Sequence, residues 1–206
     1  MAGGPGPPAA SAPPRLVLAS ASPRRAHILR TLGIPFRVVV SAVDETLKPG
    51  EAGAVAVERL ARAKAREVAR TESLPVLAAD TEVVCDGCIL GKPDSEQAAL
   101  DMLAGLAART HEVVPGLCLA HAGVLRSDVE RSLVTLAPMS EAERRWYVAT
   151  GEPMDKAGGY HVDGKGALFI ASVSGSPSNV AGLPVRLLLR LAREAGVDLG
   201  FLGVRS

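Results

Sequence analysis

Two hydroxyls and two guanidiniums lie together near the start of the chain, in the segment S-A-S-P-R-R at residues 20–25. The apolar residues before it predict a short buried strand, while Ser22 and Pro23 are typical of a helix N-cap and first helical position. Free backbone N–H groups in a first helical turn carry partial positive charge, and the adjacent arginines add full charges. The segment therefore suits a phosphate group, although an ordinary capped helix with solvated arginines has the same pattern.

Acidic side chains follow two further predicted strands. Residues 36–40 predict a strand that leads to Glu45, and residues 75–79 predict another that ends at Asp80. Between them, residues 51–70 predict a long helix in which Lys64 shares a face with the apolar Leu60 and Val68. A lysine on that face either extends its ammonium to solvent along the apolar surface or reaches into a site.

A hairpin is predicted after Asp80. The strand continues through residues 82–84, and Asp86-Gly87 is a preferred pair for a two-residue type I′ turn. The returning strand over residues 89–93 would bring Lys92 close to Asp80.

The same turn separates a C-x-x-C pair, which raises the alternative of a metal or redox site. A second paired spacing, which makes such a signal specific for zinc, is missing from the sequence. Zinc binding is therefore the weaker interpretation. It would draw on Cys85, Cys88, Cys118, His111 and His121.

The remaining elements mix helices with strands and place the chain in the α/β or α+β class. A capping box of Ser140 and Glu143 starts one helix, and a glycine-rich loop at residues 151–160 suits a site or a tight corner. We also expect strands over residues 112–119, 131–136 and 167–173, a helix over residues 94–106, and a closing helix over residues 179–194 that Gly182 and Pro184 interrupt near its start.

Composition limits the classes of function. The chain of 206 residues is 48% hydrophobic and 22% charged, which is typical of a globular protein with a substantial core. Residues 1–14 consist almost wholly of Gly, Pro, Ala and Ser and predict a disordered tail, followed by one domain over residues 15–206. A net charge of +1 and 3% aromatic residues disfavour a nucleic-acid-binding module, and no apolar run is long enough for a membrane span.

The candidate site groups combine cations suited to a polyphosphate with carboxylates suited to Mg²⁺. That mixture favours metal-assisted phosphoryl chemistry, with Mn²⁺ as the other metal to consider. The chain has neither a Walker A sequence nor a G-x-S-x-G elbow, which disfavours a P-loop NTPase and a serine hydrolase. The candidates are Ser20, Ser22, Arg24, Arg25, Glu45, Lys64, Asp80, Thr81, Lys92, Asp155 and Lys156.

Seven segments in matching order resemble the Maf family of nucleotide pyrophosphatases: S-A-S-P-R-R, V-D-E-T, A-D-T-E-V-V, G-K-P, H-E-V, Y-V-A-T-G-E-P-M-D-K-A-G-G-Y and N-V-A-G-L-P. The resemblance implies an α/β architecture like that of inosine triphosphatase, with a mixed sheet, flanking helices and two lobes around a central cleft. It also implies hydrolysis of a nucleoside triphosphate to the monophosphate and pyrophosphate, a divalent metal, a cytoplasmic location and a homodimer.

The resemblance assigns roles to individual residues. Asp80 matches the family's proton acceptor, and Glu45 matches an acidic position expected to hold the metal together with Asp80. Arg25, Lys64 and Lys92 match basic positions that resemble phosphate clamps. Ser20 and Ser22 would add hydroxyl and backbone donors, and His111 a structural contact at a strand start.

Base specificity is where this chain departs from the family pattern. Relatives that prefer dTTP and UTP carry Arg, Thr and Gln at three selector positions, which here are Arg24, Thr81 and Asp163. An ionised aspartate only accepts hydrogen bonds, so it would recognise a base N–H and repel a carbonyl. The block Y-H-V-D-G also differs from the usual Y-G-I-Q-G at His161. We expect dTTP or UTP as substrate, with modified nucleotides or methylated GTP as the alternative.

A second hypothesis is a nucleotide-binding regulator of cell division with little turnover. Binding alone needs cations, whereas a pair of metal-holding carboxylates makes more sense for hydrolysis. Glu45 and Asp80 therefore favour an enzyme.

Overall fold

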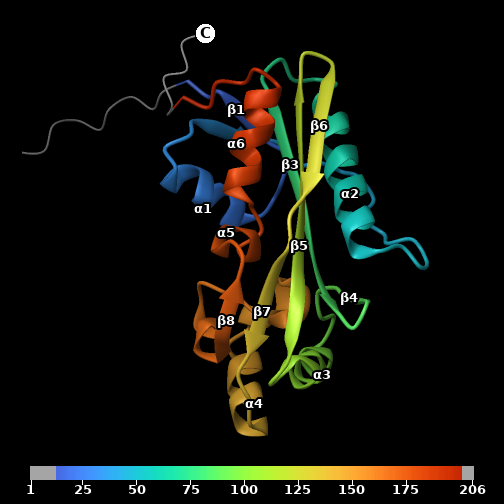
Figure 1. The fold of residues 1–206 in the computed structure, drawn as a ribbon, viewed down its shortest axis with the longest axis vertical. Coiled ribbons are helices and arrows are strands. Elements are labelled where there is room, and N and C mark those ends of the chain that lie inside the picture. The colour runs from blue at the N-terminus through green and yellow to red at the C-terminus, as the bar shows by residue number, and fades with distance from the viewer. Residues whose placement is uncertain (1–12, 201–206) are drawn as a thin grey trace, which may run out of the picture.

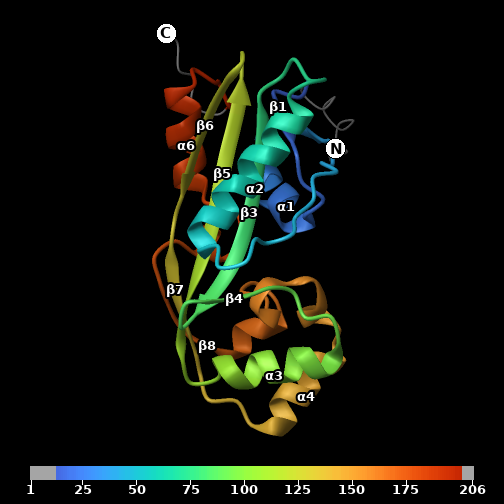
Figure 2. The same cartoon turned by 90° about the vertical axis from the view of Figure 1, so that its right-hand side faces the viewer.

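The computed structural model describes residues 13–200, so the predicted tail lies outside the described residues except for Pro13 and Pro14. One mixed sheet runs through the molecule and joins an upper and a lower lobe (Figures 1 and 2). Its strands follow the order β2-β1-β3-β5-β7-β8, with β4 paired to β3 and β6 paired to β5. The strands are β1 (Leu16–Leu18), β2 (Phe36–Val38), β3 (Val76–Cys85), β4 (Cys88–Leu90), β5 (Thr110–His121), β6 (Val124–Val129), β7 (Ser132–Leu136) and β8 (Ile170–Ser174).

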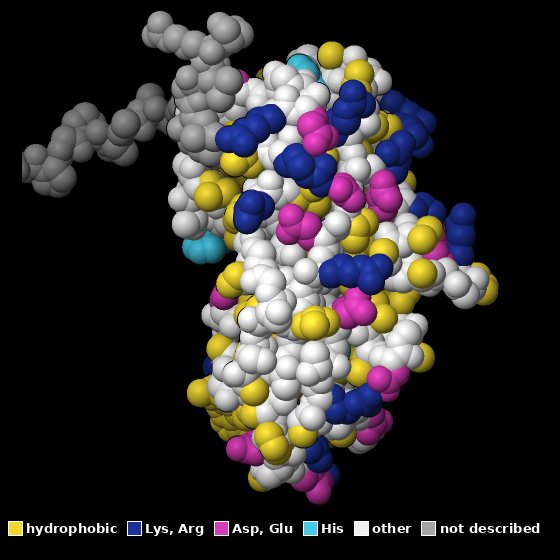
Figure 3. Space-filling view, in the orientation of Figure 1, with side chains coloured by type: hydrophobic (Ala, Val, Ile, Leu, Met, Phe, Trp, Pro, Cys, Tyr) yellow, Lys and Arg dark blue, Asp and Glu magenta, His cyan; other side chains and the backbone are white. Residues whose placement is uncertain are grey.

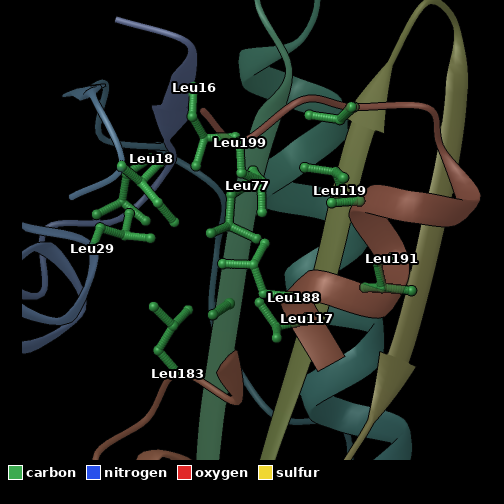
Figure 4. Close-up of a cluster of buried hydrophobic side chains, with 14 of the residues drawn as sticks. Leu16, Leu18, Leu29, Leu77, Leu117, Leu119, Leu183, Leu188, Leu191 and Leu199 are labelled. Carbon is green, nitrogen blue, oxygen red and sulfur yellow. The ribbon is translucent and has the colours of Figure 1, made fainter. Parts of the chain in front are cut away.

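The upper lobe covers the sheet on both faces. α1 (Pro23–Thr31) and α6 (Val185–Glu194) pack on one face, while α2 (Gly53–Val68) packs on the other (Figure 1). β1 and the first half of β3 are buried throughout, because both faces of these strands are covered. Successive residues of one strand therefore belong to different cores. Leu77 lies in the leucine-rich core with α6 (Figure 4), whereas its neighbour Val76 packs with α2.

The lower lobe is built on the far halves of β3 and β5. α3 (Glu96–Leu106) and α4 (Glu141–Ala149) lie there together with β7 and β8 (Figure 2). Three short 3₁₀ helices complete this lobe: η1 (Glu152–Asp155), η2 (Ala157–Gly159) and η3 (Lys165–Phe169). Because β3 has 10 residues and β5 has 12, both strands reach from one lobe into the other.

Several local predictions are confirmed. Ser22 is the N-cap residue of α1, and the capping box of Ser140 and Glu143 starts α4. Asp86 and Gly87 both have positive φ, as a type I′ turn requires, and Cys85 pairs with Cys88 across the β3–β4 hairpin. The predicted mixed α/β sheet with flanking helices is confirmed as well.

Two elements differ from the predictions. β6 was not expected, because its alternating sequence contains charged and polar residues and pairs with β5 at the sheet surface. The strand expected from residue 167 starts only at Ile170, because residues 165–169 form η3. The predicted interruption of the closing helix is confirmed: the segment forms two helices, α5 (Pro177–Val180) and α6, because Gly182 adopts φ +91° and Pro184 precedes α6.

No helix within residues 13–200 combines the length and the apolar character that crossing a membrane requires. On the face drawn in Figure 3, cationic and acidic side chains are intermixed, so that face presents no continuous basic surface.

Close packing of α2 against β5 depends on Gly116. A Cβ at this position would lie 2.7 Å from both the carbonyl carbon and the oxygen of Val57. We predict that Gly116→Ala lowers the free energy of unfolding by about 1–3 kcal/mol, because backbone atoms must move apart. Gly105→Ala is the matched control, since a Cβ there meets no atom within 4 Å. Denaturant unfolding measures both, and a Gly116→Ala protein as stable as the wild type would contradict this packing.

Candidate functional site

A cleft of about 480 Å³ lies at the carboxyl ends of β1 and β2, beside the middle of β3. β2 and β3 both run parallel to β1, but β3 continues past the cleft to Cys85 in the lower lobe. Ligands in open α/β sheets bind outside the carboxyl ends of the strands. The lower lobe supplies the opposite wall through residues that follow η1 and η2, including Lys156 and His161.

The N-terminal end of α1 faces this cleft. The Ser22 side chain makes no capping hydrogen bond, so it leaves the backbone N–H groups of the first turn to other acceptors. Ser20 is buried, and its Oγ accepts hydrogen bonds from the Ser22 N–H at 3.2 Å and from the Arg25 guanidinium at 3.0 Å. This end of the helix presents the donors and partial charge that bind phosphate.

Arg25 is held by the protein itself. Its guanidinium also donates to the Ala79 carbonyl at 2.9 Å, to Thr81 Oγ1 at 3.1 Å and to the Gly182 carbonyl at 2.9 Å. Burial lowers the pKa of Arg25 from its usual value. A guanidinium has five N–H donors, and four of these bonds are made within the protein. Arg25 therefore ties β1, β3 and the α5–α6 turn together, and has little capacity left for a phosphate.

Lys64 connects the two predicted metal-holding carboxylates. Its side chain is buried, and its Nζ lies 2.6 Å from Asp80 Oδ1 and 2.8 Å from Glu45 Oε1. The alternative in which this lysine extends to solvent is wrong, because the ammonium points into the cleft. Lys64 therefore places one positive charge between the two carboxylates.

Glu82 is a cleft residue that the sequence analysis did not select. It lies on β3 two residues after Asp80, and alternate residues of a strand share a face. Its Oε2 is buried and has no hydrogen-bond partner within the described residues. Burial, with the nearby Asp80 carboxylate, raises the pKa of Glu82 to about 7. The period of the strand was the signal that could have revealed it.

Three further cations line the cleft. Arg24 belongs to the first turn of α1, and Lys92 follows β4, as the predicted hairpin requires. Lys156 is buried at the end of η1, where its Nζ donates to the Glu152 carbonyl at 3.1 Å and to the Asp155 carboxylate. Arg24 and Lys92 have no ion pair within residues 13–200, so their charges remain available to an anionic ligand.

One predicted selector residue lies elsewhere. Asp163 is exposed and is not among the residues that line the cleft, whereas Arg24 and Thr81 are. The cleft thus brings together every other predicted site residue, from Ser20 in the upper lobe to Lys156 in the lower lobe. The individual roles assigned to these residues stay predictions.

Comparison with known proteins agrees with the family resemblance of the sequence motifs over almost the whole chain. The family described as Maf-like protein matches residues 15–195. The chain belongs to the Maf family. A dTTP/UTP pyrophosphatase of Anaeromyxobacter sp. is 47% identical over 190 residues, which cover 90% of this chain and 91% of that protein. One from Salinibacter ruber is 48% identical over 188 residues, with coverage of 89% and 92%.

Among solved structures, the Staphylococcus aureus Ham1 protein is similar with a TM-score of 0.47 and 16% identity. The match covers 89% of this chain and 99% of that one. The assignment to the Maf family rests on the sequence relationship.

The carboxylates of this Maf protein fit a divalent cation that binds together with a nucleotide. Glu45, Asp80 and Glu82 offer the hard oxygen ligands that Mg²⁺ prefers, and the unpartnered Glu82 Oε2 leaves one such oxygen unsatisfied. No group of three or more His, Cys, Asp or Glu side chains in the described part of the chain is placed to hold a metal by itself. Magnesium usually needs only one or two carboxylates, because phosphate oxygens and water complete its shell.

A buried histidine supports the lower wall of the cleft. His111 Nε2 lies 2.8 Å from the hydroxyl of Tyr160, a lining residue, and burial lowers the pKa of His111 to about 4. In the unfolded chain this imidazole has an ordinary pKa of about 6.5. Between pH 6.5 and pH 4 the unfolded state therefore binds a proton that the folded state does not.

We predict that this histidine makes the protein about 3 kcal/mol less stable at pH 4 than at pH 6.5. His111→Gln should remove that part of the pH dependence while keeping a partner for Tyr160. Denaturant unfolding of wild type and variant across this range measures the difference. The exposed His27 is the control, because His27→Gln should leave the slope unchanged. Parallel slopes for His111→Gln and wild type would contradict the prediction.

Proposed function

We propose that this protein hydrolyses nucleoside triphosphates to the monophosphate and pyrophosphate, with dTTP and UTP as substrates. The observation that carries the proposal is the buried ion pair of Asp80 and Lys64 on the floor of a cleft that also holds the N-terminal end of α1. The two relatives described above are named dTTP/UTP pyrophosphatases, and their matches cover 90% and 89% of this chain.

In the proposed reaction Asp80 accepts a proton from water, whose oxygen forms a bond to the α-phosphorus. The bond from that phosphorus to the bridging oxygen breaks, and the electron pair leaves with pyrophosphate. Lys64 donates a hydrogen bond to Asp80 and so orients the carboxylate that accepts the proton. Arg24, Lys92 and the first turn of α1 neutralise charge that develops on the leaving group.

Glu45, Asp80 and Glu82 are the residues that would hold a divalent cation in this cleft. Such a cation supplies charge neutralisation and polarises the phosphoryl oxygens. The family resemblance also implies a homodimer, which remains a proposal.

Replacing Asp80 by Asn should abolish most turnover without preventing nucleotide binding. General base catalysis typically contributes about 10²–10⁴-fold, so we expect pyrophosphate release from UTP to fall by that factor. Affinity for a non-hydrolysable α,β-imido analogue of UTP, measured by calorimetry, should stay within a few-fold of wild type. Asp101→Asn is the control, because Asp101 is exposed on α3 away from the cleft.

Two results would overturn this proposal. Undiminished release by Asp80→Asn would exclude Asp80 as the proton acceptor. A wild-type protein that binds every nucleotide tested and cleaves none would instead favour the nucleotide-binding regulator.

Removal of divalent cations should stop the reaction. The cleft is lined by four acidic side chains, those of Glu45, Asp80, Glu82 and Asp155, and a triphosphate adds negative charge that the lining cations balance only in part. We predict loss of pyrophosphate release in excess chelator and recovery when Mg²⁺ is restored. Full activity in the chelator would remove the metal from the mechanism.

A further inference from the structure

The cleft has two chemically different walls. The upper wall is polar and cationic and contains the α1 N-terminus with Ser20, Ser22 and Arg24. Anionic phosphates bind such a surface, whereas the apolar faces of a base pack against hydrophobic side chains. The other wall, at the junction with the lower lobe, is mostly apolar. Its apolar residues are Val83, Val113, Ala157, Tyr160, Val162 and Val180, beside the polar Asp155, Lys156 and His161.

His161 brings polar ring nitrogens to this apolar wall. This residue lines the cleft and is half-buried, and neither ring nitrogen has a hydrogen-bond partner in the part of the chain that the structure describes. Burial lowers the pKa of His161, and the facing cations Arg24 and Lys156 lower it further, against weaker opposite effects of Glu152 and Asp163. The ring is therefore neutral at pH 7, with one nitrogen that donates and one that accepts.

The backbone behind His161 is fixed by a buried network. The His161 N–H donates to the Tyr147 hydroxyl at 2.9 Å, and this hydroxyl donates to Glu152 Oε1 at 2.8 Å. Gly164 packs so closely that a Cβ there would lie 2.6 Å from His161 Nδ1 and 2.5 Å from Glu152 Oε2. A side chain at the edge of a cleft whose backbone is fixed by hydrogen bonds is prearranged for a ligand.

We infer that the His161 imidazole, and not the Asp163 carboxylate, contacts the base of the bound nucleotide. This inference rests on the proposed function, because it takes the phosphates to lie at the upper wall. Asp163 is exposed outside the cleft, two residues further along the chain. An ionised Asp163 would repel the carbonyl oxygens of uracil or thymine, whereas a neutral imidazole can donate to them. His161 thus makes a pyrimidine with carbonyl groups an acceptable base.

Binding measurements with two probes separate a base contact from a phosphate contact. The probes are the α,β-imido analogue of UTP and inorganic triphosphate, titrated by calorimetry with Mg²⁺. His161→Ala should weaken binding of the UTP analogue by roughly two- to tenfold, the range of one neutral hydrogen bond. It should leave binding of inorganic triphosphate unchanged. His161→Gln should restore most of the affinity, because an amide both donates and accepts.

Asp163→Asn is the matched control and should change neither affinity. Equal weakening of both probes by His161→Ala would overturn the inference in favour of a phosphate contact. An effect of Asp163→Asn on the UTP analogue larger than that of His161→Ala, or no effect of either His161 variant, would overturn it as well.

Turnover distinguishes failure of this inference from failure of the proposed function. With UTP as substrate, His161→Ala should raise KM and change kcat little, since the ring lies away from the reacting phosphorus. If the wild type released no pyrophosphate, the proposed reaction would fail, while the two binding titrations would still decide whether His161 contacts the base.

Discussion

The buried ammonium of Lys64 is the interaction on which the cleft depends. A charge removed from water must be paired, and breaking such a pair by removing one partner typically costs about 3–5 kcal/mol. Here the pairing joins α2 to β3 through Asp80 and to the loop after β2 through Glu45. One side chain thus links three segments at the cleft. It also places a positive charge between two carboxylates where a triphosphate and its cation would meet.

Arg25 has the corresponding role at the other side of the cleft. Its bonds reach Ser20 after β1, Ala79 and Thr81 on β3, and Gly182 before α6. Most of its donors are used inside the protein, so it shapes the phosphate end of the cleft rather than occupying it. Arg24, the adjacent residue in the first turn of α1, has no such partners and presents its charge to the ligand. Adjacent arginines of one motif therefore have different surroundings.

Glu82 and His161 show how surroundings change the chemistry of ordinary side chains. Glu82 follows Asp80 on the same face of β3, where burial and a neighbouring negative charge make its ionised form costly. His161 faces two cations across a half-buried wall, which favours its neutral form. Glu82 suits a cleft that binds a cation, and His161 suits a cleft that binds an uncharged base. Glu82 lies within the A-D-T-E-V-V motif and His161 directly after the motif that ends at Tyr160, so both add to the candidate site residues chosen from the sequence.

Local sequence was sufficient for the elements whose signals are local. Ser22 and Pro23 start α1, Asp86-Gly87 turns the hairpin, and a capping box starts α4, because each depends on residues a few positions apart. The motif positions also identified most of the cleft. Tertiary structure decided what periodicity could not: whether Lys64 met solvent or Asp80, which arginine stayed available, and that Asp163 lies outside the cleft. Those outcomes depend on burial and on partners distant in sequence, and only the folded sheet brings them together.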